Sequence, residues 1–285
     1  MNNNAIIQWI LYFFFYCFIG WIWETCYVSI SNRKFCNRGF MTGPFLPIYG
    51  FGAITILLVT IPVEKNLVLL FIVGMCAATI LEYVTGVLME SIFKVRYWDY
   101  SNQKLNLNGH ICLSSSIAWG GASILITKGI HVPIARIISS IPEGVQEILA
   151  VALSIIVSVD FTYSVRDALD IKEILMNMKE NNEELQRLQK RLDVLIAVID
   201  DEKQNWKIKI EQLVDIDLKT LGGQFSDIKT ELEAMKKKVM VFAIRKDLRS
   251  RKMKRHVNKL LHRNPNAVSK EFKKELEEVK RMREN

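Results

Sequence analysis

Residues 5–30 read AIIQWILYFFFYCFIGWIWETCYVSI and contain a single charged side chain, Glu24. A helix needs about 20 mostly apolar residues to cross the hydrocarbon core of a bilayer, so this stretch is long enough to span it. No basic segment precedes it and no small-residue cleavage site follows it, which is not the pattern of a signal peptide. We therefore expect it to remain in the mature protein as a membrane helix, and this fixes the class of fold.

Four further segments have the same length and apolar composition, so the sequence predicts five membrane-spanning helices. They cover residues 44–63, 67–93, 111–130 and 145–165. Backbone amides in lipid have no water to bond to, which makes helices the default spanning structure. The stretch 133–141 is too short to span and is predicted to be interfacial. The predicted fold class is all-α, with a polytopic membrane helix bundle over residues 1–167 and a cytosolic helical tail after it.

Charge divides the chain at the same place. Residues 1–167 carry 10 Lys or Arg and 9 Asp or Glu, whereas residues 168–285 carry 28 and 21, so the tail holds most of the net charge of +8. Basic side chains follow the first, third and fifth spans. The positive-inside rule then places the N-terminus outside and the C-terminus in the cytoplasm, as in a multi-pass protein of the plasma membrane.

The tail has the periodicity of a coiled coil. Apolar residues alternate steps of three and four from Ile171 to Ile199, with Asn181 as the one polar seam position, and this predicts a coiled coil over residues 168–221. A second heptad run with a basic segment covers residues 222–263, and a short C-terminal helix covers 264–285. The two runs could pair between chains, giving a homo-oligomer, or fold back as a hairpin within one chain.

A basic block within the tail suggests partners. Residues 236–263 hold twelve Lys or Arg and one acid. Three interpretations stay open: a solvated helix face, binding to anionic lipid headgroups, or binding to nucleic acid. The third is the least favoured, because no recognised nucleic-acid-binding fold accompanies the block.

Four acidic residues lie within predicted spans: Glu24, Glu82, Glu90 and Asp160. Glu24 and Glu82 are each surrounded by a turn or more of apolar residues, and a charge at mid-bilayer costs about 2.5–3.5 kcal/mol or more. Such residues usually face a partner or a water-filled cavity. Glu24 and Glu82 therefore either line a proton, ion or substrate path, or brace the fold by pairing with cations such as Arg38 and Arg96.

The second span begins irregularly. Residues 37–52 read NRGFMTGPFLPIYGFG, and two prolines and four glycines in sixteen residues do not suit a smooth helix. Irregular backbone at membrane depth survives where protein covers it or where it lines a cavity. This segment is either the lining of a site or a tight turn with Pro44 near the first turn of the helix.

These blocks carry a resemblance to a known family. The sequence resembles the bacterial membrane family labelled putative ABC-transporter type IV, or CmpB-like, over about residues 10–165. The resemblance rests on GWIWE (20–24), NRGF (37–40), GPFLPIYGFG (43–52), LEYVTG (81–86), RYWDY (96–100) and NLNGHICL (106–113). On the predicted topology all of them fall at the cytoplasmic side, which suits an inward-facing site or docking of a cytosolic partner. The candidate site residues are Glu24, Glu82, Arg38, Gly43, Pro44, Pro47, Tyr49, Trp98, Asp99 and Asn108.

The resemblance implies a permease-like subunit of a transporter. No GxxxxGK[ST] pattern occurs in the chain, so an ATP-driven role needs a separate ATPase subunit. The rival interpretation is a non-transporting scaffold or signalling protein that presents its tail to cytosolic partners. An enzyme is not expected, because the sequence shows no nucleophile–base pair and no HExxH motif. No cofactor or metal is expected either, since the five cysteines form no CxxC pair.

The charge pattern makes a direct prediction about topology. A reporter that is active only in the cytoplasm, fused after Asn285, should be active in intact cells. A reporter that is active only outside the cytoplasm should be inactive at the same position. The opposite result would contradict the model of five spans with the tail inside.

Overall fold

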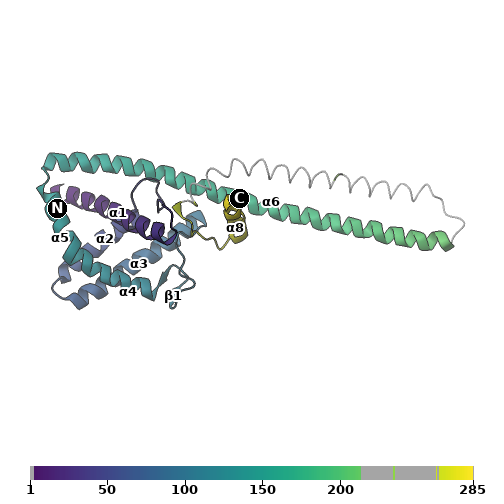
Figure 1. The fold of residues 1–285 in the computed structure, drawn as a ribbon, viewed down its shortest axis with the longest axis horizontal. Helices are drawn as coiled ribbons and strands as arrows, with labels where there is room; N and C mark the ends of the chain where they lie inside the picture. The colour runs from purple at the N-terminus through teal and green to yellow at the C-terminus, as the bar shows by residue number, and fades with distance from the viewer. Residues whose placement is uncertain (1–2, 213–233, 235–260, 262, 285) are drawn as a thin grey trace. The chain divides into compact units, whose positions relative to one another are not determined.

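The computed structural model describes residues 3–212, 234, 261 and 263–284, and most of these are helical (Figure 1). Four helices among them are long and apolar enough to cross a membrane: Asn4–Ser31, Leu67–Phe93, Leu113–Ser140 and Glu143–Glu184. The prediction of a helical membrane protein is confirmed in this form. The second predicted span is a shorter apolar helical segment, Pro47–Val63. At 1.5 Å per residue it is about 25 Å long, less than the ~30 Å hydrocarbon core, so a fifth span stays a prediction.

Helix α3 begins and ends where local chemistry directs. Helix α1 covers Asn3–Ser31 and α3 covers Leu67–Phe93. The Asn66 side chain caps α3 by accepting hydrogen bonds from the backbone amides of Val68 and Leu69, both at 3.1 Å. At the other end Lys94 adopts a left-handed conformation, with φ of 59°, and this ends the helix.

The irregular segment predicted before the second helix is present, but it is shorter than expected. No helix or strand is formed between residues 32 and 46. Helix α2 covers Pro47–Thr60 and continues as a 3-10 turn over Ile61–Val63. Pro47 stands at its first turn, where a missing N–H costs nothing. The alternative that put Pro44 in the first turn is wrong, and residues 47–52 are regular helix in spite of their glycines.

The long helix Leu113–Ser140 extends further than the sequence predicted. Helix α4 covers Leu113–Ile124, a π-helical segment η2 covers Leu125–Ile130, and α5 covers His131–Ser140. The three join into one helix, whereas the sequence placed the end of the span at Ile130 and a separate interfacial stretch after it. The π-helical turn precedes Pro133, which has no N–H to donate to the preceding turn.

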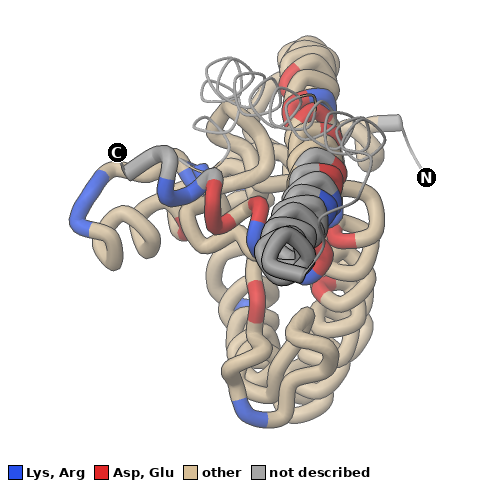
Figure 2. Tube along the Cα trace, turned by 90° about the vertical axis from the view of Figure 1, so that its right-hand side faces the viewer, with Lys and Arg blue, Asp and Glu red and all other residues tan. Residues whose placement is uncertain are grey.

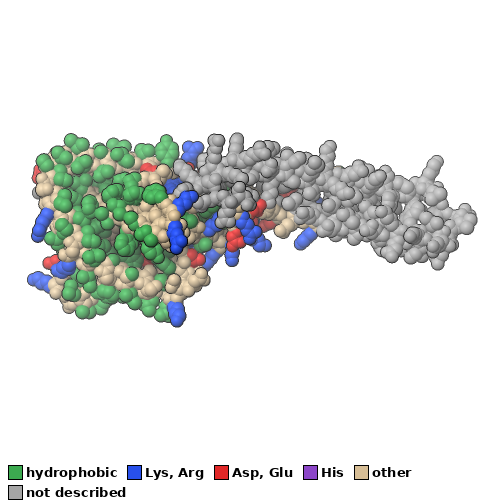
Figure 3. Space-filling model, in the orientation of Figure 1, with side chains coloured by type: hydrophobic (Ala, Val, Ile, Leu, Met, Phe, Trp, Pro, Cys, Tyr) green, Lys and Arg blue, Asp and Glu red, His purple; other side chains and the backbone are tan. Residues whose placement is uncertain are grey.

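Small residues let the helices approach one another. A side-chain Cβ at Gly74 of α3 would lie 2.4 Å from the Cβ of Ser123 on α4, and one at Gly20 of α1 would lie 2.2 Å from the ring of Tyr49 on α2. Helices in lipid associate through such close packing rather than through the hydrophobic effect. The outer surface is correspondingly apolar: hydrophobic side chains cover the visible face of this domain (Figure 3), and charged positions along its helices are few (Figure 2).

The last described residues belong to the membrane domain. Residues 1–172 and 256–285 form one compact unit, and residues 173–255 form another. Helix α6 covers Glu143–Gln212, and α8 covers Lys273–Glu284. The only strands among the described residues are β1 (Asn106–Leu107) and β2 (Ile111–Cys112), which form a small antiparallel hairpin in an otherwise helical structure. The second heptad run and most of the basic block lie outside the described residues, so pairing of the tail stays a prediction.

The contact between α3 and α4 predicts a stability difference between two glycines. Gly74→Ala should lower the thermal stability of the detergent-solubilised protein by about 1–3 kcal/mol, because its methyl group meets the Cβ of Ser123. Gly121→Ala, on the face of α4 where nothing lies within 4 Å, should be neutral or slightly stabilising. Equal effects in thermal unfolding would contradict the packing described here.

Candidate functional site

Three segments that are distant in sequence meet at one end of the membrane domain, and we call them the polar cap. They are the loop 32–46, the loop 94–112 and the C-terminal segment, residues 263–284. Arg38 in the first loop donates from Nη2 to the carbonyl of Tyr97 at 2.8 Å and from Nη1 to Oδ1 of Asn264, also at 2.8 Å. Arg38 therefore bonds to both other members of the polar cap.

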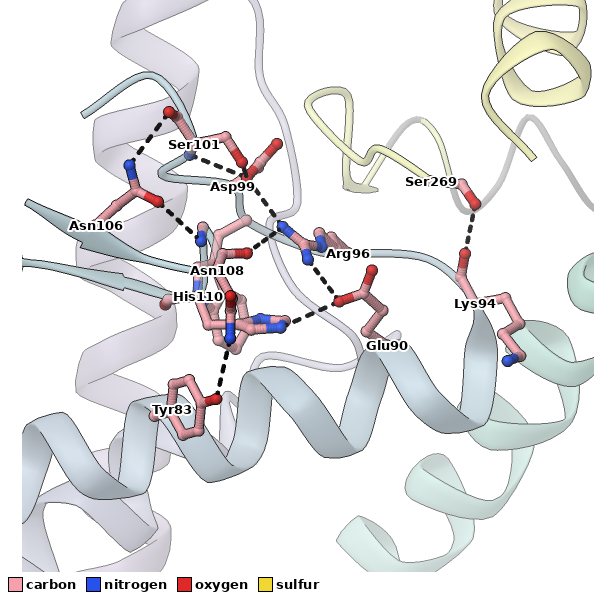
Figure 4. A network of polar contacts seen from close by, with 12 residues as sticks. Tyr83, Glu90, Lys94, Arg96, Asp99, Ser101, Asn106, Asn108, His110 and Ser269 are labelled. Carbon is pink, nitrogen blue, oxygen red and sulfur yellow. Dashed lines mark hydrogen bonds and ion pairs between the residues drawn. The ribbon is translucent and has the colours of Figure 1, made fainter. Parts of the chain in front are cut away.

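The loop 94–112 is organised around the buried guanidinium of Arg96 (Figure 4). Nη2 of Arg96 lies 2.8 Å from Oε2 of Glu90, at the end of α3, and Nη1 lies 3.3 Å from Oδ1 of Asp99. Nη1 also donates to the carbonyl of Asn108 at 2.8 Å. Because the Arg96 side chain is only 3% exposed, these contacts replace most of its hydration.

A tight turn brings His110 into the same network. Asn108 and Gly109 both have positive φ, 55° and 79°, and a Cβ at Gly109 would lie within 2.7 Å of Asp99 and Arg96. The turn places His110 Nε2 at 3.1 Å from the Glu90 carboxylate. Burial and the charge of Arg96 lower the pKa of His110, so the ring is neutral at pH 7 and Nε2–H donates to Glu90.

Glu82 lies in a different environment, beneath this loop on α3. The residue is 6% exposed, and its carboxylate accepts three hydrogen bonds from neutral groups. Oε1 accepts from the Tyr100 hydroxyl at 3.1 Å, and Oε2 accepts from Trp119 Nε1 at 3.1 Å and from Ser115 Oγ at 3.4 Å. No Lys, Arg or His forms an ion pair with Glu82 in the part of the chain that the structure describes.

Glu24 is braced by a cation, in contrast to Glu82. Its Oε2 lies 3.7 Å from Nε of Arg38, and its Oε1 accepts a hydrogen bond from the Tyr49 hydroxyl at 2.9 Å. The Tyr49 ring lies 6.0 Å from the ring of Trp119, which in turn donates to Glu82. The two intramembrane acids are therefore linked through two aromatic side chains, which we call the aromatic bridge.

The other predicted site residues lie in or beside the polar cap, with mainly architectural contacts. The Gly43 amide donates to Asp160 of α6 at 2.8 Å, and the exposed Pro44 follows it. Pro47 starts α2. Trp98 Nε1 donates to the His110 carbonyl at 2.9 Å, and the Asn108 amide donates to the Tyr83 hydroxyl at 3.3 Å. Asp99 accepts hydrogen bonds from the backbone amide and the hydroxyl of Ser101. Burial raises the pKa of the Asp99 carboxyl, but these hydrogen bonds and the charge of Arg96 lower it by more, so the net shift is downward.

Several residues of the site were not singled out from the sequence. Ser115 and Trp119 are four residues apart on α4, a spacing that puts both on one helix face, and this polar pair was a usable signal. Arg263 and Asn264 gave no such signal. They contact the loop 32–46 across more than 220 residues of chain, and helical periodicity carries no information about contacts of that range.

The site shows no arrangement for holding a metal. Among the described residues there is no group of three or more His, Cys, Asp or Glu side chains placed to bind one. Of the five cysteines, Cys17, Cys36 and Cys112 are buried. What the site offers chemically is one uncompensated acid, Glu82, and a set of hydroxyl, indole and carboxyl groups around it.

Long apolar helices closed at one end by a polar cap define a polytopic membrane protein. The family model described as putative ABC-transporter type IV matches residues 11–165, more than half of the chain. The chain belongs to this family, as its sequence motifs indicated. Comparison with curated proteins and with solved structures finds no match.

The contacts of Arg96 predict a large stability effect. Arg96→Ala leaves Glu90 and Asp99 without their guanidinium and should lower stability by about 2–4 kcal/mol, somewhat less than for a fully buried pair because both carboxylates are partly exposed. Folded yield and thermal unfolding in detergent measure the effect. Lys104→Ala, at an exposed position of the same loop, is the matched control and should behave as wild type.

Proposed function

We propose that the chain is the membrane-embedded, permease-like subunit of a transporter, and that Glu82 is the acidic position in its path. Family membership supports a protein of the ABC-transporter type. The observation that carries the proposal is the environment of Glu82, a buried acid of an apolar helix. It is held by Tyr100, Ser115 and Trp119, and no cation among the described residues forms an ion pair with it. Ionisable groups retained in such surroundings are costly to stability and are usually functional.

The contrast with the neighbouring acids supports this assignment. Glu24 contacts Arg38, Glu90 contacts Arg96, and Asp160 accepts from the backbone amides of residues 42 and 43. Each of these acids has a charged or backbone partner that explains its presence structurally. Glu82 is explained better as a group that accepts positive charge, either a proton or a cationic part of a substrate, during a transport cycle.

The donors around Glu82 suit such a role. The hydroxyls of Tyr100 and Ser115 can each donate or accept, so they can remain bonded when the carboxyl becomes protonated. Trp119 Nε1 can only donate, and it fixes one carboxylate oxygen in place. Energy for transport would come from a separate ATPase subunit, because the chain carries no P-loop sequence.

A scaffold is the rival function, and one observation favours it. Helix α6 continues without a break from the membrane domain to Gln212, well beyond the length that a membrane requires. Such a helix would present a tail to cytosolic partners whether or not the membrane domain transports anything. The two functions differ in whether Glu82 is needed.

Substituting Glu82 and Glu24 in turn distinguishes an acid that lines a transport path from one that stabilises the fold. Glu82→Gln should fold with near wild-type stability, because the amide can accept from Trp119 and donate to the Tyr100 hydroxyl, and it removes a desolvated charge. It should nevertheless fail to restore the phenotype of a deletion strain. Glu24→Gln should instead lower thermal stability, by about 1 kcal/mol or more, since it removes the charge facing Arg38.

The measurements are folded yield by size-exclusion chromatography, thermal unfolding and complementation. Glu147→Gln, at an exposed position on α6, is the matched control and should fold and complement. A Glu82→Gln variant that folds and complements fully would remove this residue from the path and favour the scaffold.

A further inference from the structure

The C-terminal segment is built into the polar cap rather than simply following the tail. Val268 forms an antiparallel bridge with Arg96, with backbone N–O distances of 2.7 and 3.1 Å. Ser269 donates from its hydroxyl to the Lys94 carbonyl at 2.6 Å. Ala267 and Phe272 are at most 2% exposed. Backbone pairing, side-chain bonding and apolar burial therefore hold the segment on the loop 94–112.

A second set of contacts holds the same segment on the loop 32–46. Arg263 donates from Nη1 to the Phe40 carbonyl at 3.1 Å and to the Thr42 hydroxyl at 3.0 Å, and its Nη2 lies 3.6 Å from Asp167 of α6. Asn264, which is 1% exposed, donates to the Gly39 carbonyl at 3.0 Å. Its Oδ1 accepts from Arg38.

Asn264 is the point at which the C-terminal segment approaches the intramembrane acids. It accepts one of the hydrogen bonds of the Arg38 guanidinium, and the same guanidinium faces Glu24. Glu24 is bonded to Tyr49, the first member of the aromatic bridge to Glu82. A continuous series of contacts thus runs from a residue near the end of the chain to the acid proposed for the path.

We propose that Asn264 is a positioning residue: seating of the C-terminal segment orients Arg38 beside Glu24, so that the segment controls the site from outside the membrane helices. The part of this inference that concerns transport through Glu82 rests on the proposed function. The binding of the C-terminal segment to the two loops does not. Because Asp167 and Arg263 are in contact, residues 168–262 form an insertion whose two ends lie side by side on the polar cap. A partner that bound the insertion and withdrew the segment would release Arg38.

A native thiol reports on the seating. Cys36 is 4% exposed, and its Sγ lies 3.8 Å from the Arg263 carbonyl, so the seated segment covers it. In full-length protein with Cys36 as its only cysteine, a membrane-impermeant maleimide should react slowly. Asn264→Ala should speed the reaction about tenfold or more, because it removes two buried hydrogen bonds and favours local opening.

Two controls separate unseating from general unfolding. In protein whose only cysteine is Cys112, which is 2% exposed and whose Sγ contacts the Ser114 hydroxyl and the Ser115 amide, Asn264→Ala should leave labelling unchanged. Lys274→Ala, at an exposed position of α8, should label at Cys36 as wild type does. Ser269→Ala loosens the segment at the Lys94 carbonyl without touching Arg38, and it serves as the milder variant if Asn264→Ala does not fold. If Cys36 is labelled at the same rate in wild type, Asn264→Ala and Ser269→Ala, the C-terminal segment does not cover Cys36 as proposed.

Rescue by a conservative change tests the positioning. Asn264→Asp keeps the oxygen that accepts from Arg38 but loses the donor to Gly39. Complementation should fail with Asn264→Ala and be recovered with Asn264→Asp. If the Asp variant is as inactive as the Ala variant, or if the Ala variant labels rapidly yet complements fully, control through Arg38 is wrong. Full complementation by Glu82→Gln would defeat the proposed function but leave the labelling result in place.

Discussion

The guanidinium of Arg38 is the interaction on which the polar end of this protein depends. A loop of fifteen residues without helix or strand, an apolar helix carrying an acid, a second loop and a segment from the end of the chain all converge on it. Arginine suits this position because its planar fork donates in several fixed directions while remaining charged. Lysine carries its three donors on one nitrogen, whereas Arg38 meets Asn264, Tyr97 and Glu24 from three different nitrogens.

Two ways of stabilising an acid occur side by side in the same domain. At Glu90 the charge is balanced by Arg96 and by a donated hydrogen bond from neutral His110. At Glu82 three neutral donors are present, and they lower the energy of the carboxylate less than a cation would. The first arrangement locks a helix end to a loop. The second leaves a group whose charge state is open to change, and this difference is the physical basis for assigning the two acids different roles.

The sequence was informative where local chemistry decides the structure. Prolines and glycines in residues 37–52 predicted irregular backbone, which the structure shows only up to residue 46, and apolar length predicted the long helices, because both effects act within a few residues. The end of the fourth predicted span was placed too early, at residue 130, whereas the helix continues to Ser140 through a π-helical turn before Pro133. The partners of Glu82 and the return of Arg263 and Asn264 were not predicted. They follow from how helices and distant segments pack, which a single sequence does not state.

The contact between Asp167 and Arg263 has a thermodynamic consequence. It closes a ring of chain that contains residues 168–262. A fully flexible ring of that length would cost about 4 kcal/mol to close by the logarithmic law, a reference value that order in the ring, such as helix α6 up to Gln212, changes. Any order within the ring reduces the entropy that closure removes. Folding of the inserted tail and docking of the chain end are therefore linked equilibria. If a ligand of the tail changes the free energy of docking, docking changes the free energy of ligand binding by the same amount.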